Sequence, residues 1–201
     1  MSSVVCQQLT NAPDLTMNYR IPLSQPSITA LEVACVTDAV ESGWVSSRGE
    51  YIDRFEETFA DYCGTKYALT TSSGTTAIHL VLLAYGIEPG DEVIVPDMTF
   101  IATANAVTYT GAKPVFVDVD RDTLCLDVTK VAQAITPKTK AIIAVHLYGH
   151  PANIPALKAI ARRHNIVVIE DAAEAHGASV RGVRTGALGD CGVFSFYGNK
   201  I

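Results

Sequence analysis

The sequence predicts an α/β protein with three layers (α/β/α), in which helices cover both faces of a mostly parallel β-sheet. The first observation is that segments of strand and helix character alternate along the chain from residue 67 onwards. The second is that several strand segments are continuous apolar runs, such as Ala141 to Val145 and Ile166 to Glu170. Such runs are typical of parallel strands that are buried on both faces.

The individual elements follow from the spacing of apolar residues and from turn residues. Pro22 and Pro26 indicate an extended entry, after which Ser27 is a candidate cap for a helix reaching to about Ser42. Apolar residues at helical spacing predict a second helix over 49–62, closed by Gly64. The expected strands are 67–71, 92–95, 114–119, 141–145, 166–170 and 193–196, and the expected helices between them are 75–85, the segment from the turn at 96–99 to about 110, 127–135 and 154–164.

Length, composition and charge limit the classes of protein. The chain has 201 residues, of which 48% are hydrophobic and 18% charged, as in a globular domain with a substantial core. A net charge of -6 without a basic run argues against nucleic-acid or anionic-membrane partners. No apolar stretch approaches the length of a membrane span, and the start lacks the pattern of a secretory signal.

The five cysteines are widely spaced and form no C-x-x-C motif, which indicates the free thiols of a cytoplasmic protein. We expect a flexible N-terminal arm over residues 1–20, because this stretch is polar and irregular, and one large domain over 21–201.

The carboxyl ends of parallel strands collect functional residues, so the polar residues just after each expected strand are the first candidates. The turn Ser73-Gly74-Thr75 lies between an expected strand and an expected helix. Free N–H groups at a helix N-terminus favour a phosphate, Gly74 allows close approach, and Thr75 adds a hydroxyl donor. Ordinary capping of the helix by Ser73 or Thr75 is the alternative. No Walker A or G-x-G-x-x-G motif supports ATP or dinucleotide binding.

Two further candidates follow other expected strands. Phe100 could stack on a flat heterocycle, or it could simply be a core residue. Asp171 follows a buried apolar run, where a carboxylate needs a partner such as a protonated pyridine nitrogen; the alternative is that it caps a short helix. Glu174 and His176 come three and five residues later, where they could reach a ligand or face solvent.

The end of the chain carries a possible nucleophile. Lys200 lies in a Gly-Asn turn five residues after Ser195, which is on the last expected strand. A lysine so placed could attack a carbonyl to form a Schiff base, although most lysines are solvated surface charges. The Ser195 hydroxyl could donate to a phosphate or bond to backbone. His146 and His150 are four residues apart, but they follow a strand and surround a glycine, so we do not expect a metal site there.

Four motifs, in this order, resemble the DegT/DnrJ/EryC1/StrS aminotransferases, which are fold-type I enzymes dependent on pyridoxal 5′-phosphate (PLP). The resemblance runs from about Ile21 to Ile201. The family acts on nucleotide-linked keto-sugars. The motifs are Ser73 to Ala77, Pro96 to Asn105, Glu170 to Ala178, and Gly189 to Lys200.

The resemblance implies a role for each matching position. Lys200 would form the Schiff base with PLP and then act as the acid and base in proton transfer. Asp171 would pair with the pyridine nitrogen, and Phe100 would stack on the ring. Glu174 stands where many members have glutamine, near the phenolic oxygen of the cofactor. Three positions would hold the phosphate: Gly74, Thr75 and Ser195.

The resemblance is strongest to the GDP-perosamine synthase branch, on the Glu-Ala-His and Gly-Asn-Lys sequences. It implies transfer of an amino group from glutamate to a nucleotide-linked 4-keto-6-deoxy sugar, in a homodimer. Members of the family continue well beyond the lysine, so we expect this chain to be the N-terminal portion of such an enzyme, with an incomplete large domain and no C-terminal small domain.

Two alternatives remain at this point. The first is a PLP-dependent sugar dehydratase, although dehydratases of the family carry histidine in place of the lysine that Lys200 matches. The second is a truncated non-catalytic remnant of the PLP fold with a binding or regulatory role.

Overall fold

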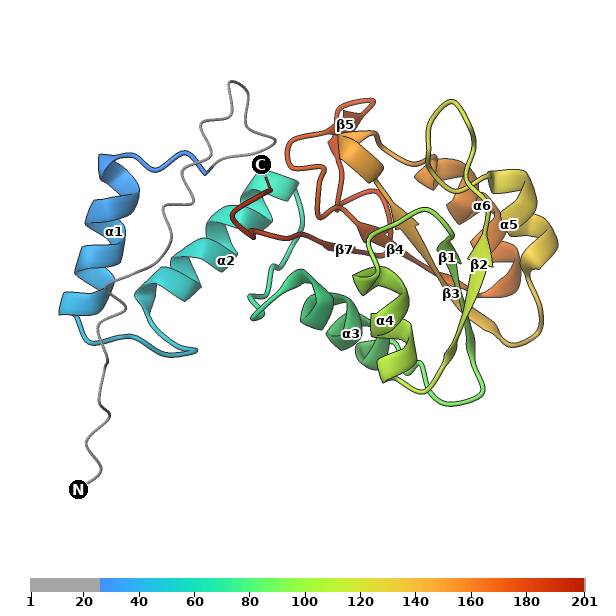
Figure 1. Cartoon of the computed structure of the whole chain (residues 1–201), viewed down its shortest axis with the longest axis horizontal. Helices are drawn as coiled ribbons and strands as arrows, with labels where there is room; N and C mark the ends of the chain where they lie inside the picture. Colours follow the sequence, from blue (N-terminus) through green and yellow to red (C-terminus); the bar gives the residue numbers. More distant parts are fainter. Residues whose placement is uncertain (1–25, 201) are drawn as a thin grey trace, which may run out of the picture.

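The computed structural model describes residues 26–200 (Figure 1). The predicted arm at 1–20, the first residues of the predicted domain, and Ile201 lie outside the described residues, so the domain limits stay a prediction.

A five-stranded parallel sheet forms the centre of the molecule. Its strands lie in the order β2-β1-β3-β4-β7, and each neighbouring pair is parallel. Parallel neighbours require long crossover connections, which the helices of the chain supply. The strands are β1 (Glu92–Pro96), β2 (Lys113–Val117), β3 (Thr139–Val145), β4 (Val167–Asp171) and β7 (Cys191–Val193).

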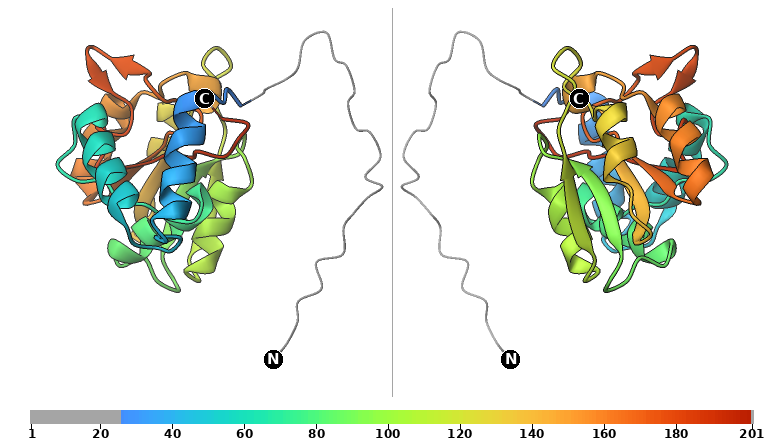
Figure 2. Two further views of the ribbon diagram at one scale, coloured as in Figure 1. Left: turned by 90° about the vertical axis from the view of Figure 1, so that its left-hand side faces the viewer. Right: turned by 90° about the vertical axis from the view of Figure 1, so that its right-hand side faces the viewer.

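Helices pack on both faces of this sheet, so the predicted three-layer architecture is confirmed. Side chains alternate between the faces: Val93 packs in one apolar cluster with residues of α3 and α4, whereas Ile94 packs in another with residues of α5 and α6. Both views in Figure 2 show the sheet between these helices. The helices are α3 (Gly74–Ala84), α4 (Ala102–Tyr109), α5 (Val128–Ala134) and α6 (Ile154–His164), and a short 3-10 helix, η1 (Leu147–Gly149), follows β3.

Two helices precede the sheet, α1 (Ala30–Glu41) and α2 (Glu50–Cys63). The predicted cap of α1 is wrong, because Thr29 and not Ser27 occupies that position and forms a capping box with Glu32. Gly64 ends α2 in the left-handed conformation, as predicted. Helix α1 has no buried residue and lies beside α2, away from the sheet (Figure 1).

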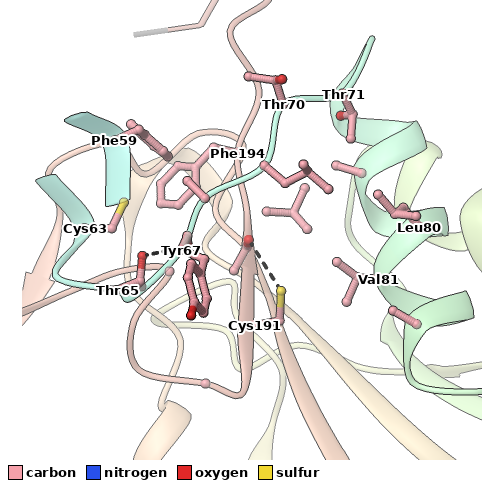
Figure 3. Close-up of a pocket in the computed structure, with 18 of the residues that line it drawn as sticks. Phe59, Cys63, Thr65, Tyr67, Thr70, Thr71, Leu80, Val81, Cys191 and Phe194 are labelled. Atoms are coloured by element: carbon pink, nitrogen blue, oxygen red, sulfur yellow. Dashed lines mark hydrogen bonds between the residues drawn. The ribbon is translucent and has the colours of Figure 1, made fainter. Parts of the chain in front are cut away.

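The predicted strand at 67–71 is not a strand in the structure. The segment has no regular secondary structure, and it pairs with no strand of the described chain. It lines a cavity of about 820 Å³, whose other walls are α2, α3 and the edge strand β7 (Figure 3). A strand requires a neighbour with which it exchanges backbone hydrogen bonds, and none of the described strands pairs with this segment.

The structure also contains a small hairpin that the sequence pattern does not predict, formed by β5 (Ser179–Val180) and β6 (Val183–Arg184). It projects from the top of the molecule in Figure 2. Gly182 in its turn has a φ of +83°, which glycine adopts readily. Among residues 26–200, no helix is long and apolar enough to cross a membrane.

Candidate functional site

The candidate residues gather past the carboxyl ends of the central strands. Asp171 is the last residue of β4, and Glu174 follows in the loop after it. Phe100 lies in the connection between β1 and α4, and Lys200 follows β7. The parallel sheet therefore brings together residues that are up to 100 positions apart, at the edge where α/β proteins bind ligands.

Lys200 contacts two of the other candidates. Its Nζ lies 3.2 Å from Oε1 of Glu174 and 5.8 Å from the centre of the Phe100 ring. The other carboxylate oxygen of Glu174 accepts a hydrogen bond from the backbone N–H of Tyr148, at 3.0 Å. The Lys200 side chain is only 17% exposed, so it is not a freely solvated surface charge. The structure thus holds the amine between a carboxylate and an aromatic ring.

Asp171 is a buried carboxylate with few partners. Oδ2 accepts a hydrogen bond from Oγ1 of Thr103, at 2.8 Å, and Oδ1 accepts one from the N–H of Ala173, at 3.2 Å. Burial raises the pKa of Asp171, while these two hydrogen bonds and the charge of Lys200 oppose the rise. No helix follows at 172–178, so the alternative reading of Asp171 as a helix cap is wrong. Its environment would favour a cationic partner.

Phe100 is 70% exposed, so the alternative that it is a core residue is also wrong. A large aromatic side chain left open to solvent beside a lysine leaves a ring face free for a flat ligand. This exposure sets Phe100 apart from Phe59 and Phe194, whose rings pack edge to face with centroids 4.9 Å apart.

The turn at 73–75 starts helix α3 beside the end of β7. Ser73 is the N-cap, since its Oγ accepts a hydrogen bond from the N–H of Thr76. The N–H groups of Gly74 and Thr75 belong to the first turn, which has no acceptors within the helix. Ser195 lies close by: a methyl group added at Gly74 would come within 3.3 Å of Cβ of Ser195. The capping by Ser73 therefore leaves the N–H groups of Gly74 and Thr75 without an acceptor within the helix.

His176 lies in the same region without a polar partner. Its ring packs against those of Phe194 and Phe196, with centroids 5.2 and 5.0 Å apart. Both ring nitrogens are buried and have no hydrogen-bond partner among the described residues. Burial, and then the charge of Lys200, lower the pKa of this imidazole. The ring is therefore held in its neutral form.

Sequence reasoning missed two contributors to this site. Thr103 is fully buried and bonds Asp171, and its hydroxyl also lies 3.0 Å from that of Thr99, four residues earlier in the connection before α4. The backbone N–H of Tyr148 orients Glu174. The threonine pair at i, i+4 was visible in the sequence, but only packing shows that it faces a carboxylate. The cavity in Figure 3 touches Ser73 but none of Lys200, Phe100, Asp171 and Glu174.

Comparison with known proteins gives these residues a context. The DegT/DnrJ/EryC1/StrS aminotransferase family matches residues 26–201. The chain belongs to this family. It is 54% identical to the GDP-perosamine synthase of Caulobacter vibrioides over 90% of this chain and 49% of that protein. It is 51% identical to the GDP-perosamine synthase of Escherichia coli O157:H7 over 92% of this chain and 50% of that protein.

A Streptococcus pneumoniae protein solved in its PLP form has the same fold, with a TM-score of 0.85 and 36% identity over 90% of this chain and 50% of that one. The chain therefore spans about half the length of the relatives that it matches. The family is one of PLP-dependent aminotransferases, which agrees with the cofactor, enzyme class and fold expected from the sequence.

The residues present fit this cofactor. PLP has a basic ring nitrogen, a flat ring, an aldehyde and a phosphate. Asp171 offers a buried carboxylate with a raised pKa, which forms no ion pair with a residue of 26–200, and Phe100 offers an exposed ring face. Lys200 offers an amine near the Phe100 ring. Gly74 and Ser195 lie together at a free helix N-terminus, where a phosphate is favourable.

Proposed function

We propose that the chain carries the PLP-binding part of an aminotransferase that moves an amino group from glutamate to a nucleotide-linked 4-keto-6-deoxy sugar. The observation that carries this proposal is the placement of the Lys200 amine beside Phe100 and Glu174, past the end of the strand that bears Asp171. The resemblance to two GDP-perosamine synthases supports a GDP-linked sugar as the acceptor.

Each residue has a distinct role in this proposal. Lys200 would be the covalent attachment point for PLP through its Nζ. Asp171 keeps a proton on the ring nitrogen, and Phe100 covers one face of the ring. When bound, the cofactor supplies an electron sink conjugated to the carbon that gains or loses the amine. Three residues bind the phosphate: Gly74, Thr75 and Ser195.

Glu174 holds Lys200 before the cofactor binds, because its carboxylate pairs with Nζ at 3.2 Å. The Tyr148 N–H fixes the other carboxylate oxygen, so the pair has a defined orientation. With PLP bound, the Lys200 amine would be the group placed to take up and return a proton at the reacting carbon. Lysine at this position supports amino transfer rather than dehydration. We further propose a homodimer in the cytoplasm as the working assembly.

The test is an absorbance spectrum of the purified 201-residue chain with PLP, followed by borohydride reduction and peptide mass spectrometry. We expect a Schiff-base band and a pyridoxyl group on Lys200, both lost in Lys200→Ala. Lys130→Ala is the matched control, because Lys130 pairs with Asp118 away from the site. Labelling spread over several lysines, with no preference for Lys200, would refute the assigned attachment point.

A second assay addresses the substrates. The chain is incubated with PLP, glutamate and GDP-4-keto-6-deoxymannose, and the products are identified by mass spectrometry. We expect 2-oxoglutarate and an aminated sugar nucleotide in equal amounts. A deoxygenated keto-sugar without an amine would show dehydration instead. Cofactor attachment without any turnover would support the non-catalytic alternative.

A further inference from the structure

A second carboxylate, Glu170, lies directly before Asp171 and has an unusually complete set of donors. Its side chain is fully buried, and each of its two oxygens accepts two hydrogen bonds, at 2.6 to 2.9 Å. One donor is the ring of His146. The other three are backbone N–H groups, those of Gly186, Leu188 and Gly189. A buried carboxylate is stable only when it is paired in this way.

The protonation of His146 follows from its neighbours. The N–H of Ala152 donates to Nδ1 of His146 at 2.9 Å, so Nδ1 carries no proton. The proton is therefore on Nε2, which donates to Oε2 of Glu170 at 2.8 Å. Ala152 thus fixes the tautomer of a fully buried imidazole, and the imidazole in turn orients the carboxylate.

The three backbone donors belong to one short segment, residues 186–189, that is wedged against the sheet. A methyl group added at Gly189 would lie 2.7 Å from the carbonyl oxygen of Val168. One added at Gly192, in β7, would lie 2.3 Å from Cα of Gly186. The backbone can approach this closely only without side chains, so the segment has a single well-defined position.

This segment leads directly into β7, which carries the chain on to Lys200. The C=O of Val193 accepts a hydrogen bond from the N–H of Ala172, the residue after Asp171. Because neighbouring side chains of a strand point to opposite faces, Glu170 binds the segment on one face of β4 while Asp171 bonds Thr103 on the other. Glu170 is thus placed to set the position of β7 relative to Asp171 without touching the cofactor site.

We propose that Glu170, oriented by His146, is a positioning residue that clamps residues 186–189 and so fixes the strand leading to Lys200 relative to Asp171. The effect on cofactor binding rests on the proposed function, whereas the clamp itself does not. The clamp can therefore be tested without PLP.

The experiment compares the wild-type chain with Glu170→Gln and His146→Phe. Hydrogen exchange of the 186–189 amides reports the clamp, and acetylation of Lys200 by acetic anhydride, relative to Lys130, reports the position of the lysine. An amide at 170 presents N–H groups to N–H donors, so we expect exchange and Lys200 acetylation to rise at least about fivefold. Leu82→Ala is the control, because it empties a buried site in the apolar cluster on the other face of the sheet, which contains no residue of 186–189.

The two variants also test each other. His146→Phe removes only one of the four hydrogen-bond donors to Glu170. Its exchange and acetylation can therefore still be measured if Glu170→Gln does not fold. In the double variant, the increases in exchange and in Lys200 acetylation should be smaller than the product of the two single increases, because both substitutions break one hydrogen-bond network. Unchanged exchange and acetylation in a folded clamp variant, or the same increase in Leu82→Ala, would overturn the clamp.

The same proteins separate this inference from the proposed function. If the wild type takes up PLP on Lys200 and the clamp variants trap less of it under the same conditions, both stand. If the wild type takes up no PLP but the cofactor-free measurements change as expected, the clamp stands and the proposed function fails.

Discussion

Nζ of Lys200 lies 3.2 Å from Oε1 of Glu174, although the two residues are 26 positions apart in the chain. The contact exists because β4 and β7 are parallel neighbours, so the segments that follow them emerge on the same edge of the sheet. The amine that we propose as the attachment point for PLP is therefore already held in place by a carboxylate.

The first prediction concerns this ion pair. Glu174→Gln keeps an acceptor for the Tyr148 N–H but removes the charge that holds Lys200. We expect the free energy of unfolding to change by less than about 1 kcal/mol, because the pair is partly exposed. Schiff-base formation with PLP, followed by stopped-flow absorbance, should become about two- to fivefold faster, which corresponds to the loss of such a pair. Asp118→Asn, which breaks the Lys130 pair, should not change this rate.

A second prediction concerns Thr103. Replacing it with valine removes the hydroxyl that bonds the buried Asp171 carboxylate. We expect the free energy of unfolding to fall by about 1–3 kcal/mol, with weaker PLP binding at equilibrium. Thr110→Val is the matched control: it loses a buried hydroxyl bonded to the carbonyl of Val107, with no link to the site. Equal losses of PLP affinity in both variants would contradict a specific role for Thr103.

The third prediction follows from the raised pKa of Asp171 in the protein without cofactor. Between the usual value of 3.8 and the raised one, the folded chain keeps a proton that the unfolded chain has lost. The free energy of unfolding should therefore fall as pH rises through this window, and Asp171→Asn should remove that fall. Asp127→Asn is the control of opposite sign, since bonds from Thr129 lower the pKa of Asp127. Denaturant titrations from about pH 2 to 8 provide the measurement, because the change due to Asp127 lies below its usual pKa of 3.8 and the change due to Asp171 lies above that value.

The fourth prediction concerns His176, whose pKa is lowered mainly by burial. The unfolded chain then takes up a proton first as pH falls below the usual value of 6.5, so the wild type should lose stability on acidification. His176→Leu should flatten this part of the profile. His164→Gln, at an exposed position, should keep it. An acid-induced loss that persists unchanged in His176→Leu would show that other groups cause it.

Much of the fold follows from local pattern. The apolar runs of β3 and β4 read as buried strands because both of their faces are covered, and Gly64 ends α2 because a left-handed residue terminates a helix there. The strand predicted at 67–71 is wrong because local pattern is not sufficient there. Its strand pattern is real, but a strand also needs a neighbour, and that depends on what the rest of the chain places beside it.

By itself, the sequence determined the chemical groups of the site: the amine of Lys200, the carboxylate of Asp171, the ring of Phe100 and the glycine turn at 74. The first three were visible because each lies at or after the end of a recognisable strand, where function collects. The turn at 74 was found from a strand pattern at 67–71 that the structure does not confirm. Only the tertiary structure decided which groups meet. Thr103 donates a hydrogen bond to Asp171, and Glu174 pairs with Lys200. Glu170 accepts hydrogen bonds from the segment at 186–189. These contacts form because the parallel sheet aligns strands that are distant in sequence. The alternation of side chains then assigns the two neighbouring carboxylates, Glu170 and Asp171, to opposite faces.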